Sequence, residues 1–186
     1  MIDQDSLKRL AAERAVSFIE SGMVVGLGHG STSLLAVHEL ASRLKRGELR
    51  DIVAIPCSPE IEAESRKLGI VITSLEEHPR IDLTVDGADE VDPHLNLIKG
   101  GGGALLREKI VAQASAREVI MVDESKLSVK LGTKWAVPVE VLEYGLRTQL
   151  AFITSLGASV TLRMAGIRPF QTADGNVILD CNFGPI

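Results

Sequence analysis

The sequence has few aromatic residues, and this scarcity argues against one class of function. Of the 186 residues, 3% are Phe, Trp or Tyr, whereas 45% are apolar in total. Proteins that bind single-stranded nucleic acid commonly stack the bases on aromatic side chains, so no such platform is expected here. The core must rest on Val, Ile, Leu and Ala, and a chain of this length can bury one.

An excess of basic charge is also lacking. The chain has 20 Lys and Arg against 25 Asp and Glu, which gives a net charge of −5. A global basic field that would attract nucleic acid or an anionic membrane is therefore absent, and neither is expected as a partner. An anionic substrate would have to be bound locally, by backbone N–H groups and a few lysines.

Signal segments, long apolar runs and paired cysteines are missing too. The N-terminal stretch MIDQDSLKRLAAERAV is acidic and amphipathic, unlike a signal peptide. No apolar run approaches the ~20 residues that span a membrane. Cys57 and Cys181 lie far apart and form no metal or redox spacing. These absences predict a reduced, cytoplasmic protein.

Apolar runs alternate with helical patterns along most of the chain. The strand-like runs are residues 23–28, 52–56, 71–73, 81–85 and 119–122, and the helical stretches are residues 6–20, 31–41, 59–68 and 104–114. This alternation predicts an α/β fold with a mostly parallel sheet. After about Pro138, strand-like runs at 139–141, 159–162 and 176–180 and a helix at 146–155 predict a smaller α+β unit. We therefore expect domains at residues 1–135 and 136–186.

Two glycine-rich loops follow predicted strands. Gly26-Leu-Gly-His-Gly-Ser-Thr32 precedes a helix whose N-terminus could bind a phosphate, although a tight turn with a Ser/Thr cap would have the same pattern. Its spacing differs from the dinucleotide pattern G-x-G-x-x-G, and it lacks the P-loop lysine. Lys99-Gly-Gly-Gly-Gly103 favours a ligand-binding loop over a linker, because ordering four consecutive glycines is entropically unfavourable.

The helix after the second loop carries a carboxylate in an unexpected place. On a helical projection, Glu108 is the one charge inside an apolar arc, whose members lie within about 70° of it: Ala104, Leu105, Val111 and Ala112. Desolvation raises the pKa of a carboxyl group, which is one way of making a general base. The alternative is a glutamate paired with a neighbouring helix.

The acidic stretch TVDGADEVD, residues 84–92, ends another predicted strand. A Mg²⁺ site and a solvated turn are both possible readings, and the spacing does not match an EF-hand. Asp86 and Asp89, separated by two small residues, could face a pocket, whereas Glu90 and Asp92 are expected to be turn and surface charges. Lys126 of the later DESK motif could meet a phosphate or simply be solvated.

Four motifs, GLGHGSTS, VDGADEVD, KGGGGALLREKIVA and VDESK, occur in this order along the chain. In their order and spacing they resemble the type A ribose-5-phosphate isomerases, over nearly the whole chain. The resemblance implies a Rossmann-like domain with helices on both faces of the sheet, a small α+β lid, dimers or tetramers, and no metal or other cofactor. It also implies interconversion of the sugar phosphates D-ribose 5-phosphate and D-ribulose 5-phosphate in the pentose phosphate pathway.

The resemblance further implies roles for individual residues. The base would be Glu108, the two aspartates of DGAD would be Asp86 and Asp89, and the oxyanion-stabilising lysine would be Lys99. The positions implied to contact substrate are Lys8, Gly28, His29, Gly30, Ser31, Thr32, Gly87, Ala88, Gly100, Gly101, Gly102 and Lys126.

The chain departs from the family pattern at two places. His29 stands where the family usually has Thr, and the sequence stops at Ile186, before the family's last helix and strand. Either the sequence is truncated at this point or the lid is incomplete at its C-terminal end.

Two other function classes fit less well. A phosphosugar sensor could dispense with Glu108 and Lys99 but would usually carry a basic DNA-binding module, which this sequence does not contain. A nucleotide-dependent oxidoreductase would need a different glycine spacing.

Overall fold

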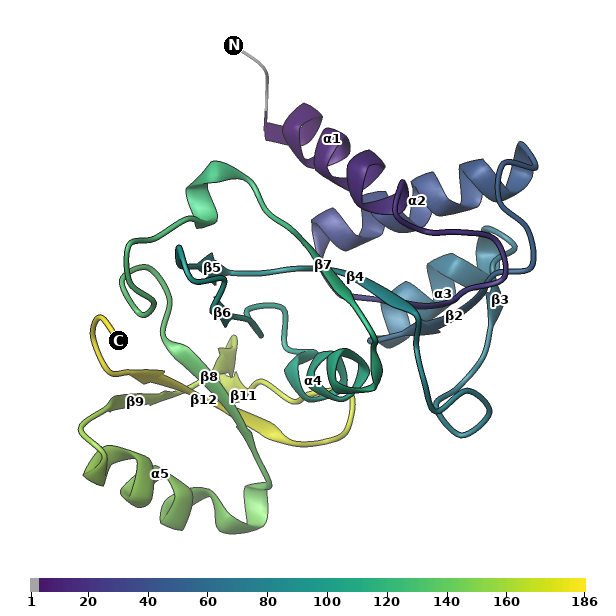
Figure 1. Ribbon diagram of the computed structural model, residues 1–186. Helices are drawn as coiled ribbons and strands as arrows, with labels where there is room; N and C mark the ends of the chain where they lie inside the picture. Colours follow the sequence, from purple (N-terminus) through teal and green to yellow (C-terminus); the bar gives the residue numbers. More distant parts are fainter. Residues whose placement is uncertain (1–3) are drawn as a thin grey trace. The chain divides into compact units, whose positions relative to one another are not determined.

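The computed structural model describes residues 4–186 and divides them into two compact units (Figure 1). The first comprises the described residues up to Gly87 together with Leu106–Ser125, and the second comprises Ala88–Leu105 and Lys126–Ile186. This division differs from the expected boundary between residues 135 and 136. Residues 126–135 group with the C-terminal part because they bind the segment after Gly87: the Ser128 N–H donates to the Val91 carbonyl at 2.8 Å.

A parallel sheet forms the centre of the first unit. Its strands run in the order β3-β2-β1-β4-β7, and every neighbouring pair is parallel. The strands are β1 (Val24–Leu27), β2 (Val53–Pro56), β3 (Val71–Ile72), β4 (Leu83–Gly87) and β7 (Glu118–Met121). The order confirms the predicted α/β fold. From β1 the chain builds the sheet outward on both sides, so the carboxyl ends of β1 and β4 flank the point where ligands bind in such sheets.

Helices cover both faces of this sheet, as the resemblance implied. The helices are α1 (Gln4–Val16), α2 (Ser31–Lys45), α3 (Pro59–Lys67) and α4 (Leu105–Ala114). Successive strand residues point to opposite faces. Val25 and Leu27 accordingly join the core that holds α1, α2 and α3, whereas Val24 packs against the core that holds Val111 of α4.

The starts of α2 and α3 differ in how they are capped. Ser58 is the N-cap of α3 and accepts a hydrogen bond from the Ile61 N–H at 3.3 Å. The expected Ser/Thr cap of α2 is wrong, because the N-cap is Gly30, which makes no side-chain cap hydrogen bond. Gly30 has φ 110°, a conformation that glycine adopts readily and other residues do not. Ser31 and Thr32 therefore lie in the first turn of α2.

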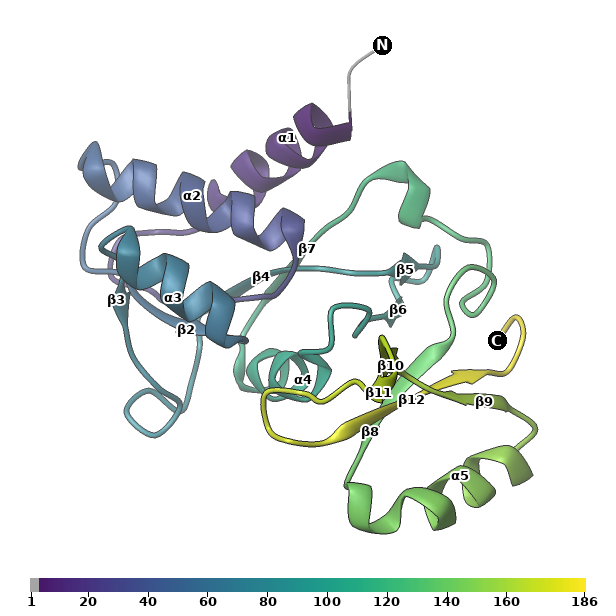
Figure 2. The same cartoon turned by 180° about the vertical axis from the view of Figure 1, so that it is seen from behind.

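The second unit is built on an antiparallel sheet with strand order β8-β12-β9, seen from behind in Figure 2. These strands are β8 (Val137–Val141), β9 (Ser159–Leu162) and β12 (Val177–Asn182), and α5 (Leu146–Ser155) packs on them. The strands and the helix predicted after Pro138 are confirmed. Short elements that the sequence did not reveal are β5 (Glu90–Val91), β6 (Leu97–Ile98), β10 (Met164–Ala165), β11 (Arg168–Pro169) and the 3₁₀ helices η1 (Glu124–Lys126) and η2 (Glu143–Gly145).

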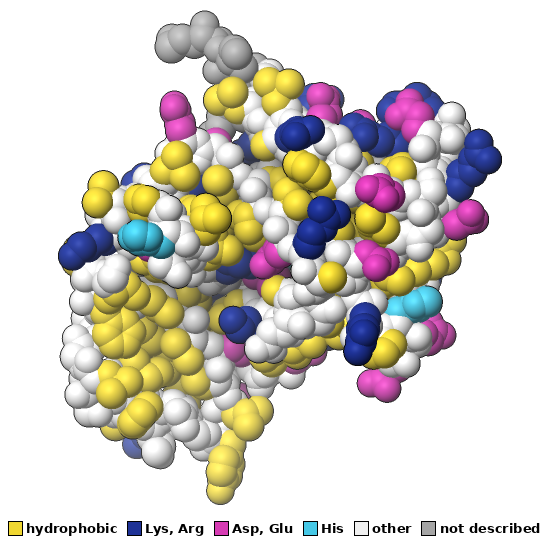
Figure 3. Space-filling view, in the orientation of Figure 1, with side chains coloured by type: hydrophobic (Ala, Val, Ile, Leu, Met, Phe, Trp, Pro, Cys, Tyr) yellow, Lys and Arg dark blue, Asp and Glu magenta, His cyan; other side chains and the backbone are white. Residues whose placement is uncertain are grey.

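The surface of the second unit is rich in apolar side chains, which gather at the lower left of the space-filling view (Figure 3). Helix α5 buries Ile153 in the core of this unit and leaves Phe152 exposed, as is Leu156 at its C-cap. Over residues 4–186, no helix combines the length and the apolar character needed to cross a membrane.

Candidate active site

The glycine turn after β1 is shaped by the side chains of the neighbouring strand β4. A Cβ atom on Gly26 would lie 1.9 Å from the Thr84 Oγ1, and a Cβ atom on Gly28 would lie 1.9 Å from the Asp86 Oδ1. Neither distance allows a side chain. The sequence motif therefore reflects close packing against the side chains of β4, and the approach of its backbone to a ligand stays a prediction.

Asp86 lies at the carboxyl end of β4 and is almost completely buried, with 1% of its surface exposed. Its Oδ1 accepts hydrogen bonds from the Gly87 N–H at 2.7 Å and from the Ser33 hydroxyl at 3.3 Å. Strand β4 and helix α2 thus fix the orientation of this carboxylate next to Gly28.

The N-terminus of α2 has the features of an anion site. Lys8 of α1 places its Nζ 3.3 Å from the Ser31 Oγ, in the first turn of α2. Backbone N–H groups and the helix dipole favour a negative charge there, and the lysine adds a full positive charge. The structure thus places Lys8 next to Ser31, two residues that the resemblance assigned to substrate contact. His29 instead turns towards α3, with its Nδ1 2.9 Å from the Ser58 Oγ.

Replacing Gly28 with alanine should lower kcat/KM by about 10²-fold, because a displacement of catalytic groups by about 1 Å has an effect of this size. The added Cβ would lie 1.9–2.6 Å from Asp86 side-chain atoms, and the buried carboxylate would have to move. Steady-state kinetics of the isomerisation that the four-motif resemblance implies would measure the loss. Gly145→Ala is a matched control, because Gly145 has φ −103° and its Cβ would meet only the Gln149 Cγ at 3.9 Å. Unchanged kcat/KM in Gly28→Ala would contradict the assignment of Gly28 and Asp86 to the active site.

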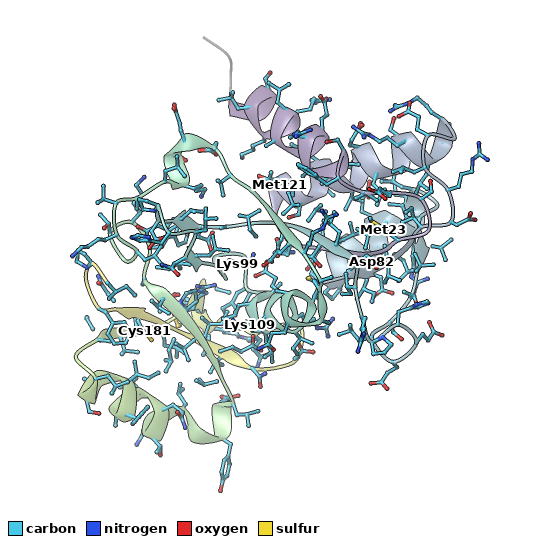
Figure 4. All side chains as sticks on the ribbon, viewed as in Figure 1. Met23, Asp82, Lys99, Lys109, Met121 and Cys181 are labelled. Carbon is cyan, nitrogen blue, oxygen red and sulfur yellow. The ribbon has the colours of Figure 1, made fainter. Side chains whose placement is uncertain are left out.

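Helix α4 buries the carboxylate that the helical projection singled out. Glu108 lies in the first turn with 5% of its surface exposed, and Val111 on the same side of the helix is 3% exposed. Lys109, which the projection places outside the apolar arc, is exposed (Figure 4). The predicted inward orientation of Glu108 is confirmed.

The second unit holds Asp89 and the four-glycine loop together. The Gly101 N–H donates to the Asp89 Oδ2 at 2.7 Å, and the Asp89 N–H donates to the Ile98 carbonyl at 2.9 Å. Gly100 and Gly103 have φ values of 108° and 86°, which only glycine adopts without strain. The loop is therefore an ordered turn, as expected from its place between a strand and a helix.

Two predicted lysines also belong to the second unit. Lys99 directly follows β6 and is half-buried (Figure 4). Lys126 lies over the Trp135 ring, with its Nζ 5.4 Å from the ring centroid, a geometry that favours a cation–π interaction.

The predicted site residues are divided between the two units. The first unit brings together Gly28 with Asp86 and Lys8 with Ser31, and the second brings together Asp89 and Gly101. The remaining predicted positions lie in the same segments: His29, Gly30, Thr32, Gly87 and Glu108 in the first unit, and Ala88, Lys99, Gly100, Gly102 and Lys126 in the second. Among residues 4–186, no three His, Cys, Asp or Glu side chains are grouped so that they could hold a metal ion.

The prediction that Glu90 is a surface charge is wrong. Glu90 is completely buried, and its carboxylate accepts hydrogen bonds from the N–H groups of Gly132 at 3.1 Å, Lys134 at 3.2 Å and Trp135 at 3.1 Å. These donors lie more than 40 residues along the chain, so no local pattern could reveal them. Asp92 does cap a turn, accepting from the N–H groups of His94 and Asn96.

A family model for ribose 5-phosphate isomerase A (phosphoriboisomerase A) matches residues 53–186. The chain belongs to the ribose-5-phosphate isomerase A family of enzymes. One relative is the ribose-5-phosphate isomerase A of Desulfatibacillum aliphaticivorans, which is 56% identical over 187 residues, covering 100% of this chain and 81% of the relative. The resemblance based on the four motifs is therefore confirmed.

Solved ribose-5-phosphate isomerases share the fold. The enzyme from Plasmodium falciparum has a TM-score of 0.94 at 43% identity, and the match covers 98% of this chain and 81% of that chain. A D-ribose-5-phosphate isomerase solved in complex with phospho-erythronic acid has a TM-score of 0.96 at 40% identity, covering 100% of this chain and 82% of that chain. The predicted α/β class is thus shared with solved members of the ribose-5-phosphate isomerase A family.

Proposed function

We propose that the protein interconverts D-ribose 5-phosphate and D-ribulose 5-phosphate, with Glu108 as the base. The observation that carries this proposal is the burial of the Glu108 carboxylate in the first turn of α4, directly after the four-glycine loop. A carboxylate shielded from water within an enzyme of this family has the chemistry that a carbon-to-carbon proton transfer needs.

The reaction moves a carbonyl group between C1 and C2 of the sugar. In the aldose, the carboxylate of Glu108 removes the proton on C2, and the electron pair of the broken C–H bond forms a cis-enediolate. The carboxylic acid then returns the proton to C1, while the proton of the C2 hydroxyl passes to O1. One glutamate can therefore serve first as base and then as acid.

Charged and polar groups would stabilise the enediolate and hold the sugar. Lys99 and the N–H groups of the glycine loop would stabilise the negative oxygen, in the manner of an oxyanion hole. Asp86 and Asp89 would bind sugar hydroxyls and help to move their protons, including during opening of the ring. Both carboxylates are already oriented by hydrogen bonds from backbone N–H groups.

The phosphate would be bound at the start of α2. Ser31, Thr32 and the N–H groups of the first helical turn offer donors, and the contact of Lys8 with Ser31 supports a positive charge at this position. Lys126 would add a further charge. We propose that the enzyme acts as a cytoplasmic homodimer or homotetramer in the pentose phosphate pathway, as family membership suggests.

Isomerase activity on ribose 5-phosphate should be present and should survive EDTA. No step of the proposed mechanism uses a metal, since Glu108 moves the proton and Lys99 with the loop stabilises the oxyanion. The formation of ribulose 5-phosphate, measured with and without EDTA, checks both statements. Activity lost with EDTA and restored by Mg²⁺ would contradict the metal-free mechanism, and no activity in either condition would contradict the proposed function.

A further inference from the structure

Arg163 joins the four-glycine loop to the antiparallel sheet of the second unit. It follows β9, and its Nη1 donates to the Gly100 carbonyl at 2.7 Å and to the Gly101 carbonyl at 3.2 Å. On its other edge the guanidinium binds Asp180 of β12, through Nε at 3.0 Å and Nη2 at 2.5 Å. The arginine side chain is 15% exposed, so this contact is largely shielded from water.

The two carbonyl contacts determine where the N–H groups of the loop point. In a planar trans peptide, the C=O and the following N–H point in opposite directions. Because the Gly100 carbonyl faces Arg163, the Gly101 N–H points away from it, and this N–H does donate to Asp89 at 2.7 Å. The Gly101 carbonyl also faces Arg163, so the Gly102 N–H points away from the guanidinium as well.

We propose that Arg163, held by Asp180, is a positioning residue for the isomerisation. It fixes two successive peptide groups so that their N–H donors face the side of the loop where Asp89 lies. Four consecutive glycines have little conformational preference of their own, and the guanidinium supplies the orientation that the sequence of the loop cannot. This inference rests on the proposed function, in which the Gly101 N–H orients the carboxylate of Asp89 and the Gly102 N–H is a loop donor to the enediolate oxygen.

An arginine that orients the N–H groups of the loop and one that only anchors the sheet would have different effects on the enzyme. A bidentate ion pair that only stabilised the sheet would affect the folded fraction and nothing else. A residue that orients transition-state donors affects kcat, because donors aimed at a developing charge act mainly in the transition state. Polarisation of the two carbonyls by the guanidinium would also strengthen the N–H groups as donors.

Arg163→Met should lower kcat by about 10- to 100-fold, with KM changed by about twofold or less. Arg163→Lys, which can reach one carbonyl but lacks the fork, should recover part of the loss. Asp180→Asn, which keeps the arginine but loosens it, should lower kcat by a smaller factor. Arg147→Met removes the same charge from an exposed position in α5 of the same unit and should leave kcat unchanged.

Rates are normalised to the folded fraction, measured by near-UV circular dichroism, and inorganic phosphate is titrated as a binding probe. Phosphate affinity should not change in any Arg163 or Asp180 variant. A kcat within twofold of the parent enzyme in Arg163→Met, or a loss explained by the folded fraction alone, would overturn the inference. If Arg163→Met does not fold, kcat is measured in Arg163→Lys and Asp180→Asn instead. Values within twofold of the parent enzyme in both variants would then overturn the inference. A parent enzyme with no activity overturns the proposed function itself, which is a separate result.

Discussion

Glu108→Gln should lower kcat by about 10²–10⁴-fold, the range that general acid–base catalysis contributes. Glutamine has nearly the same size and fits the same buried position in the first turn of α4. Its amide cannot take a proton from carbon, so the chemical step is lost while the shape of the site is kept. Steady-state kinetics would give kcat, and calorimetric titration with ribose 5-phosphate would show that binding is largely retained.

The matched control for this change is Glu76→Gln, which removes one negative charge from an exposed position of the same unit. We expect its kcat and KM to equal those of the parent enzyme. Near-normal turnover in Glu108→Gln would show that another group moves the proton. A loss of sugar-phosphate binding equal to the loss of kcat/KM would instead assign Glu108 to substrate binding.

Glu90→Gln should destabilise the protein by about 1–3 kcal/mol, the effect of leaving a buried donor unsatisfied. The carboxylate accepts from three backbone N–H groups between Gly132 and Trp135. Glutamine has one acceptor oxygen, and its NH₂ group would face donors. Urea unfolding at neutral pH would measure the change in the free energy of unfolding.

The pH dependence of this difference follows from the pKa of Glu90. Burial raises the pKa of this carboxyl, but the hydrogen bonds it accepts outweigh burial and hold the pKa below its ordinary value of 4.5. A carboxyl whose pKa is depressed by folding stabilises the native state above its unfolded pKa, and this contribution is lost as the pH falls through the folded pKa. The difference in the free energy of unfolding between the parent protein and Glu90→Gln should therefore have its full value at pH 7 and decrease below about pH 4.5.

An exposed glutamate of the same unit supplies the control for the stability measurement. Glu143→Gln removes the same charge at the surface and should change the free energy of unfolding by less than about 0.5 kcal/mol. Equal stabilities of Glu90→Gln and Glu143→Gln at neutral pH would mean that the three N–H groups find other acceptors.

Local patterns in the sequence were enough to predict the sheet of the first unit and the orientation of Glu108. The strands are short apolar runs bounded by glycines or charged residues, and each helix shows its own apolar spacing. The burial of Glu108 could be predicted because a helix fixes the direction of each side chain from its neighbours alone. The glycine loop that contains Gly28 could be recognised from the sequence. The Asp86 side chain of β4, which leaves no room for a Cβ atom at Gly28, lies 58 residues away along the chain.

Contacts between distant segments could not be predicted. The donors to Glu90 lie 42 to 45 residues away, and the carbonyls bound by Arg163 lie 62 and 63 residues away. No pattern within one element encodes such partners. The two-residue strands β5 and β6 are also too short for an alternating pattern, and their pairing depends on the hairpin that joins them.

The acidic stretch after β4 is a series of acceptors for backbone N–H groups. Asp86, Asp89, Glu90 and Asp92 each accept at least one such hydrogen bond. The donor to Asp86 is the last residue of β4, and the donors to the other three carboxylates lie in turns and loops. Dissolved salt screens charges that face each other across water, but it does not remove a hydrogen bond made at contact distance. The loops held by Asp89, Glu90 and Asp92 should therefore keep their shape over a wide range of ionic strength, although the stretch looks from its composition like a salt-sensitive surface.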